Sequence, residues 1–159
     1  MNRLLCPSTE GSRAAVLAAA LLWPLLACAD VKQDIERAEL SYRNGDVVTA
    51  MTLLRKAADQ GYAPAQARLA DLLDAAEQDA EAVALYRKAA EQGDPAGEYG
   101  LSRMLVNGEG VARDLQQALA LLRTAAAKDH PPAIEALARA YRAGSLGLPR
   151  DLQQATGQY

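Results

Sequence analysis

The sequence predicts an all-α fold in which antiparallel helix pairs are stacked into an α-solenoid. One seven-residue motif occurs in three similar copies, which begin at Arg55 (RKAADQG), Arg87 (RKAAEQG) and Arg123 (RTAAAKD). Successive copies are therefore 32 and 36 residues apart. A second phrase, RDLQQA, begins at Arg113 and recurs 37 residues later at Arg150. Self-similarity at a period of roughly 30–40 residues is the signature of a helical repeat array.

The composition supports this fold and narrows the class of function. Aromatic residues make up only 4 % of the chain and Phe is absent, so the core must be built from Ala and Leu. Alanine has the highest helix propensity, and its small side chain lets helices approach closely. With 159 residues the chain forms at most one ordinary domain. Its formal net charge of -3 argues against a general nucleic-acid binder, which would be basic.

Residues 30–61 are expected to form the first of four helix-pair units. Asn44-Gly45 ends its first helix, and Asp46 caps the second. Gly61 ends the second helix because glycine readily adopts the left-handed conformation. The expected apolar stripe of the first helix comprises Ile35, Ala38, Leu40 and Tyr42.

The second unit, residues 62–93, repeats this scheme. Ala63-Pro64 begins its first helix, since proline is tolerated in a first turn. Asp79 is expected to cap the second helix and Gly93 to close it. The apolar positions of the unit are Leu69, Ala70, Leu72, Leu73, Ala82, Val83, Leu85, Tyr86, Ala89 and Ala90.

The third and fourth units, residues 94–129 and 130–159, have longer loops between their helices. Asp94-Pro95 opens the third unit, and Asp114 with a glutamine three residues later predicts a capping box. Asp151 repeats that box in the fourth unit. The final helix stops at Tyr159 after barely two turns, so the apolar end of the array requires either more chain or a covering partner.

Residues 1–29 are predicted to be a secretory signal peptide. The apolar run Ala14–Leu22 is too short to span a membrane as a helix, but it suits the hydrophobic region of an export signal. Ala27 and Ala29 supply small residues at positions −3 and −1, which predicts cleavage after Ala29. Cys6 lies within this leader, so the mature chain is expected to hold no disulfide and no thiol nucleophile.

A second interpretation of the leader stays open. Leu25-Leu26-Ala27-Cys28 resembles a lipobox, in which Cys28 would become the lipidated first residue of a bacterial lipoprotein. Leu26 is bulky for that motif, and the helical pattern begins almost at once with no tether. These two features favour simple cleavage.

The third and fourth units resemble Sel-1-like repeats, which are relatives of the tetratricopeptide repeat with a longer inter-helix loop. The third unit carries the resemblance through Leu101-x-x-x-Leu105-x-x-Gly108-x-Gly110-Val111-x-x-Asp114-x-x-x-Ala118, and the fourth through Leu137, Ala138, Tyr141, Gly144, Gly147 and Asp151. The first two units lack the glycine loop and look more like ordinary tetratricopeptide repeats. The resemblance covers residues 31–159 and implies a right-handed, tetratricopeptide-like superhelix that binds proteins or peptides on its concave side. Exported bacterial members are associated with envelope assembly, polysaccharide secretion and host contact.

Few residues suggest catalysis or metal binding. His130 is the sole histidine, which excludes a multi-histidine metal site and a Ser-His-Asp triad. The acidic residues are those of solvated helix faces. We therefore expect a protein that is not an enzyme and needs no cofactor.

The resemblance also implies which side chains line the concave face. In the family, certain positions of the first helix of each unit face the groove. The residues at those positions in this chain are Arg43, Arg68, Asp71, Tyr99, Arg103, Glu135, Arg139 and Arg142. Arginine offers forked donors and tyrosine a rigid amphipathic contact, so this set suits an acidic or extended peptide. The alternative, that these are ordinary solvated charges, stays open.

Together these observations predict an exported, non-enzymatic adaptor or scaffold of the bacterial cell envelope, located in the periplasm. Its partner would be a protein or peptide rather than nucleic acid. The alternative is a structural lipoprotein, anchored to the membrane through Cys28, in an export or polysaccharide-secretion assembly. Self-association through the unfinished last unit is also open.

Overall fold

The computed structural model describes residues 31–157, and within that range the chain forms helices and no strand. A first helix covers residues 31–43, and the next helices are α2 (Val47–Asp59), α3 (Ala63–Ala75), α4 (Asp79–Glu91), α5 (Pro95–Asn107), α6 (Leu115–Ala127), α7 (Pro131–Ala143) and α8 (Leu152–Gly157). The predicted signal peptide, Cys6, Cys28 and Tyr159 lie outside the described residues.

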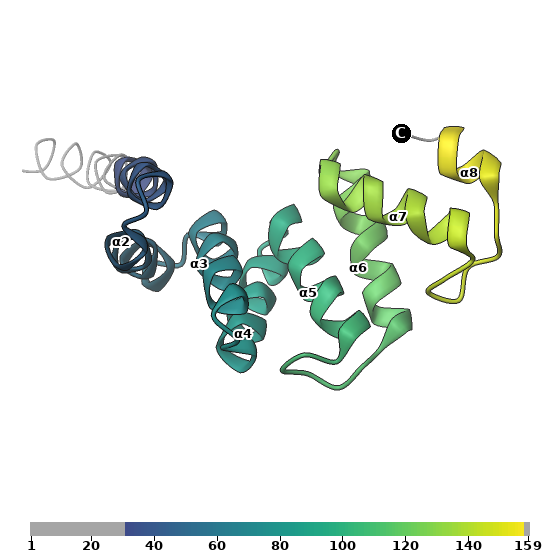
Figure 1. Cartoon of the computed structure of the whole chain (residues 1–159), viewed down its shortest axis with the longest axis horizontal. Helices are drawn as coiled ribbons and strands as arrows, with labels where there is room; N and C mark the ends of the chain where they lie inside the picture. Colours follow the sequence, from purple (N-terminus) through teal and green to yellow (C-terminus); the bar gives the residue numbers. More distant parts are fainter. Residues whose placement is uncertain (1–30, 158–159) are drawn as a thin grey trace, which may run out of the picture.

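The helices follow one another in a single elongated row, from the first helix at one end to α8 at the other (Figure 1). From α2 onward each helix packs against the next along the chain, and α3 also packs against α5 in the following unit. Such contacts between neighbouring units alone define a solenoid. The predicted all-α solenoid of consecutive helix-pair repeats is therefore confirmed.

Aspartate caps begin most of the second helices, as the sequence predicts. The carboxylate of Asp46 accepts the backbone N–H of Thr49 at 3.0 Å. Asp114 accepts two N–H groups at 3.0 Å, and Asp151 accepts two at 2.9 and 3.0 Å. Asp94 caps α5 in the same way, through the N–H of Gly97 at 2.9 Å. Each cap satisfies a backbone donor that has no partner inside its helix.

The expectation that Asp79 caps α4 is wrong. Asp79 is the first residue of the helix, and the cap position belongs to Gln78, whose side chain makes no cap hydrogen bond. Gln78 lies 32 residues after Asp46, which is the repeat interval of these units. The backbone N–H of Gln78 also bonds to Leu73 O just as that of Asp46 bonds to Ser41 O. The repeat register thus places the cap one residue earlier.

The expected apolar stripe of the first helix is also partly wrong. Val31, Asp34 and Ala38 are the buried residues of this helix, whereas Leu40 and Tyr42 are each 53 % exposed. The buried residues follow the three- and four-residue spacing of one helix face. Leu40 lies two positions beyond Ala38, about 200° around the helix at 3.6 residues per turn, and so points away from the core.

Two glycines inside α5 allow α4 and α5 to pack closely. A Cβ on Gly100 would lie 2.2 Å from Cε1 of the Tyr86 ring, and one on Gly97 would lie 2.5 Å from the Cβ of Ala89. Tyr86 and Ala89 are both fully buried. The alanine- and leucine-based core predicted from composition is confirmed, and the large Tyr86 fits into it only because α5 has no side chain at Gly100.

The buried residues form two clusters rather than one. The first runs from the first helix to Ala118, near the start of α6, and the second joins the rest of α6 to α7 and Leu148. We call the boundary between them the seam. None of the helices within residues 31–157 is long and apolar enough to cross a membrane.

Candidate binding surface

Two hollows are lined mostly by the first helices of the units, namely residues 31–43, α3, α5 and α7. We call the side of the solenoid that these helices form the first-helix face. The hollow between the first helix and α3, the N-terminal pocket, has a volume of about 250 Å³. The hollow between α5 and α7, the C-terminal pocket, has a volume of about 360 Å³.

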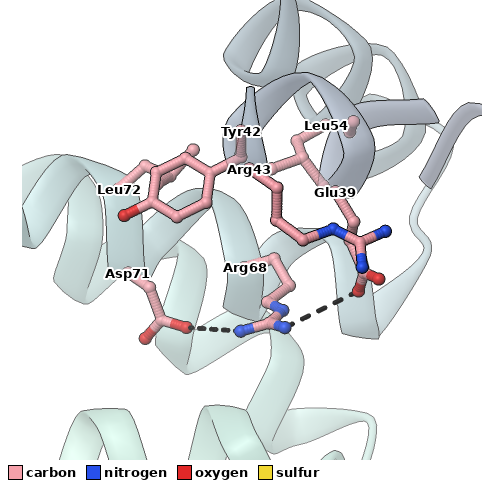
Figure 2. A pocket seen from close by; sticks show the side chains of 8 residues that line it. Glu39, Tyr42, Arg43, Leu54, Arg68, Asp71 and Leu72 are labelled. Atoms are coloured by element: carbon pink, nitrogen blue, oxygen red, sulfur yellow. Dashed lines mark ion pairs between the residues drawn. The ribbon is translucent and has the colours of Figure 1, made fainter. Parts of the chain in front are cut away.

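The N-terminal pocket brings together three of the predicted binding residues (Figure 2). Its lining is Ala38, Glu39, Tyr42, Arg43, Leu54, Arg68, Asp71 and Leu72. Arg68 reaches Glu39 at 3.6 Å and Asp71 at 3.9 Å, and the lining as a whole holds two arginines and two carboxylates. The pocket is therefore balanced in charge over an apolar floor.

Asp71 is held in place from beneath the surface. The hydroxyl of buried Tyr86, on α4, donates a 2.7 Å hydrogen bond to Oδ1 of Asp71. Burial raises the pKa of Tyr86 far above its usual value, and the hydrogen bond and negative charge of Asp71 raise it further. Tyr86 thus remains a protonated donor throughout the physiological range. The sequence marks Tyr86 only as a core residue, because its partner lies on another helix.

The C-terminal pocket brings together three more predicted residues, Tyr99, Arg103 and Arg139. Its lining is Tyr99, Ser102, Arg103, Val106, Asn107, Leu122, Ala136, Arg139, Ala140, Ala143, Ser145 and Leu146. This lining contains two arginines and no carboxylate. The carboxylates that pair with these arginines, Asp74 and Glu135, lie outside the pocket.

Arg103 links this pocket to the preceding unit through an ion pair with Asp74 on α3. Partial burial by itself lowers the pKa of Arg103, but the nearby Tyr86 and Asp74 outweigh it and raise that pKa above its usual value. Arg139 pairs with Glu135 at 3.3 Å, one turn earlier on α7. Each guanidinium at the pocket is therefore engaged in an ion pair.

Two of the predicted residues line neither pocket. Glu135 is exposed and serves as the ion-pair partner of Arg139. Arg142 is exposed on the last turn of α7. Six of the eight residues that the resemblance selected therefore lie in the pockets. Their role in binding stays a prediction.

His130 precedes α7 and packs against Tyr99, with ring centroids 5.6 Å apart. Its side chain makes no cap hydrogen bond. Over the part of the chain that the structure describes, no three potential metal ligands come together.

A ladder of buried polar residues, one in each of the first three units, was not predicted from the sequence. Asp34, Gln66 and Glu98 recur every 32 residues and are less than 8 % exposed. Each binds a side chain from the second helix region of its own unit: Asp34 with Lys56 at 2.7 Å, Gln66 with Gln92 at 2.8 Å, and Glu98 with Lys128 at 2.6 Å. The 32-residue recurrence of polar residues among alanines was the available signal.

The geometry defines a helical-repeat scaffold whose first helices present a pocketed surface. The Sel1 repeat pattern matches residues 41–62, 63–94, 95–130 and 131–156. These four matches cover most of the chain, and the protein belongs to the Sel1 repeat family. Proteins of this family are generally non-catalytic and mediate protein–protein interaction.

Solved structures and curated relatives are similar to this chain. A Sel1 repeat protein from Oxalobacter formigenes has a TM-score of 0.72 at 22 % identity, over 79 % of this chain and 53 % of the other. A protective antigen of uropathogenic Escherichia coli has a TM-score of 0.71 at 32 % identity, over 82 % of this chain and 29 % of the other.

Among curated relatives, a chitin synthase regulator of Saccharomyces cerevisiae is 33 % identical over 107 residues, which are 65 % of this chain and 15 % of the relative. An uncharacterised protein of Neisseria meningitidis serogroup B is 35 % identical over 125 residues, which are 76 % of this chain and 26 % of the relative. The chain thus spans about a quarter or less of the length of these relatives.

Proposed function

We propose that this protein is an adaptor or scaffold of the bacterial cell envelope that binds a partner protein on its first-helix face. One observation carries the proposal. Six residues expected at the binding surface, from units far apart in the sequence, gather at two pockets on that one face. The pockets combine apolar floors with arginine, tyrosine and carboxylate groups, a mixture suited to a peptide backbone and its side chains.

Export to the envelope rests on residues 1–29 alone. Their apolar run and the small residues Ala27 and Ala29 suit a cleaved signal. Fractionation of cells that express the full chain tests this part of the proposal. A mature protein in the periplasm supports it, whereas a protein retained in the cytoplasm contradicts it. Membrane retention that disappears in Cys28→Ser would favour the lipoprotein alternative instead.

Chemical crosslinking in cells, followed by mass spectrometry of what co-purifies with a tagged chain, tests the binding face. The test variant is Arg68/Arg103/Arg139→Glu, which reverses charge at both pockets. The matched control is Arg87/Lys88/Arg123→Glu, which reverses three exposed cations that line neither pocket. A defined envelope protein that the test variant loses and the control keeps supports the proposal. A partner kept by both, or no partner, contradicts it.

A further inference from the structure

The first helices of successive units do not all pack against one another in the same way. α3 packs directly against α5, but α5 and α7 have no comparable direct packing. The C-terminal pocket occupies this opening, with Tyr99 to Asn107 of α5 on one side and Ala136 to Ala143 of α7 on the other.

The opening coincides with the seam in the core. Leu122 and Ala140, which belong to the second core cluster, are nearly fully buried and still line the pocket. Ser102 lines it too, but its hydroxyl is already engaged by the carbonyl of Ala118 at 2.9 Å. The floor of the pocket is therefore apolar, and the hydroxyl of Ser102 in it already has a hydrogen-bond partner. A volume of about 360 Å³ falls within the range of ligand pockets, roughly 300–1,000 Å³.

The rim carries two ion-paired guanidinium groups that keep unused N–H donors. Each guanidinium has five N–H donors in a planar fork. Arg103 and Arg139 each use a single nitrogen in the ion pairs with Asp74 and Glu135. Both guanidinium side chains remain substantially exposed, at 42 % and 58 %. In the N-terminal pocket the carboxylates Glu39 and Asp71 belong to the lining itself, whereas Asp74 and Glu135 pair with Arg103 and Arg139 from outside the C-terminal lining.

We infer that the C-terminal pocket is the anchor site of the binding face and takes an extended segment of a partner protein with a bulky apolar side chain beside an acidic residue. The apolar side chain fills the opening between α5 and α7, and the carboxylate reaches Arg103 and Arg139. This assignment rests on the proposed function and adds the chemistry of the partner. Filling a gap at the seam also joins the second core cluster to the first, so binding stabilises the C-terminal unit.

Selection from a phage-displayed library of random dodecapeptides on the purified chain tests the assignment. Enriched peptides are synthesised with a fluorescent label, and binding is measured by anisotropy. We expect the enriched peptides to share an acidic residue next to a large apolar one. Enrichment of basic peptides, or no enrichment, overturns the assignment.

Four variants locate the site. Arg139→Glu reverses the rim charge, and Ala136→Leu partly fills the pocket without a change of charge. We expect each to weaken binding by about tenfold or more. Their matched controls, Arg123→Glu and Ala120→Leu, make the same changes at exposed positions of α6 outside the lining and should bind like the original chain.

A fifth variant separates this inference from the proposed function. Peptides weakened by Arg43→Glu but not by Arg139→Glu would bind the N-terminal pocket, which overturns the anchor assignment and leaves the binding face intact. The in-cell crosslinking described above tests the proposed function itself, independently of this assignment. Circular dichroism of every variant verifies that the fold is retained.

Discussion

The hydroxyl of Tyr86 donates a 2.7 Å hydrogen bond to Oδ1 of Asp71, and this bond joins the core to the first-helix face. Tyr86 comes from α4 and is fully buried, whereas Asp71 lines the N-terminal pocket from α3. Because the ring is locked against Gly100 of α5, three helices from two units meet at one point. The position of a surface carboxylate is thus set by packing underneath it.

Tyr86→Phe tests the value of this bond. The substitution keeps the ring and removes only the hydroxyl, so the free energy of unfolding should fall by about 1 kcal/mol, as for a typical hydrogen bond. Urea denaturation measures the change. The control is Tyr42→Phe, at a ring that is 53 % exposed, which should leave the midpoint unchanged. Equal midpoints for Tyr86→Phe and the original chain would contradict the account.

Gly100→Ala tests the close packing of α4 against α5. Alanine would gain about 1 kcal/mol in helix propensity over glycine. The new Cβ, however, would overlap the Tyr86 ring at 2.2 Å, so we expect a net loss of roughly 1–3 kcal/mol from overpacking. In a Tyr86→Ala background the same change should become neutral or stabilising. An unchanged cost in that background would show that Tyr86 is not the obstacle.

Lys128→Met tests the buried ladder at Glu98. Lys128 supplies the 2.6 Å contact to Glu98 Oε1, while Oε2 has no hydrogen-bond partner among the described residues. Removal of the cation leaves a buried carboxylate unpaired, which should lower the free energy of unfolding by about 2 kcal/mol. The double variant Glu98→Leu/Lys128→Met should recover part of that loss, because no charge then remains buried. A double variant less stable than Lys128→Met would contradict the role of the pair.

Asp114→Ala and Asp79→Ala form a matched pair that tests the repeat register. Asp114 accepts two backbone N–H groups at the start of α6, so its loss should cost about 1 kcal/mol. Asp79 is already inside α4 and should contribute only a few tenths of a kcal/mol, through the helix dipole. Thermal denaturation of the two variants under identical conditions gives the comparison. A larger effect at Asp79 would place the cap where the sequence analysis had put it.

Ala89→Arg should abolish or severely impair folding, since a long charged side chain cannot enter a fully buried contact against Gly97. Ala84→Arg places the same side chain at an exposed position of the same helix and should fold normally. Circular dichroism and thermal unfolding measure both. Similar unfolding of the two variants would mean that the assigned phase of α4 is wrong.

The repeats made the fold predictable because their phrases recur at fixed places on the helices. The RKAA phrase locates the end of each second helix, and glycine or aspartate residues fix the turns on either side. The cap of α4 was missed because the residue type of Asp79 was given more weight than the 32-residue register that relates Gln78 to Asp46. The inner face of the first helix was missed in part because Leu40 was chosen for its hydrophobicity, although it lies about 200° around the helix from Ala38.

The positions of the site residues could be predicted from the sequence, but most of the ion pairs that they form could not. The phase of the repeats places Arg68 and Arg103 on the first-helix face. It does not reveal that Glu39 compensates Arg68, or that Asp74 compensates Arg103, because those pairs join different helices. Whether the carboxylate that pairs with an arginine lies inside or outside a pocket lining depends on how the units pack. The opening between α5 and α7 depends on the same packing.

Site-specific photocrosslinking in cells tests the central claim most directly, that the first-helix face binds a partner protein. A photoreactive amino acid is placed singly at Arg43, at Asn107 or at Arg123. The first two positions line the two pockets, and the third is exposed on α6 outside both. We predict a discrete adduct with the same partner from Arg43 or Asn107 and none from Arg123. An adduct from Arg123 alone, or none from any position, would contradict the account.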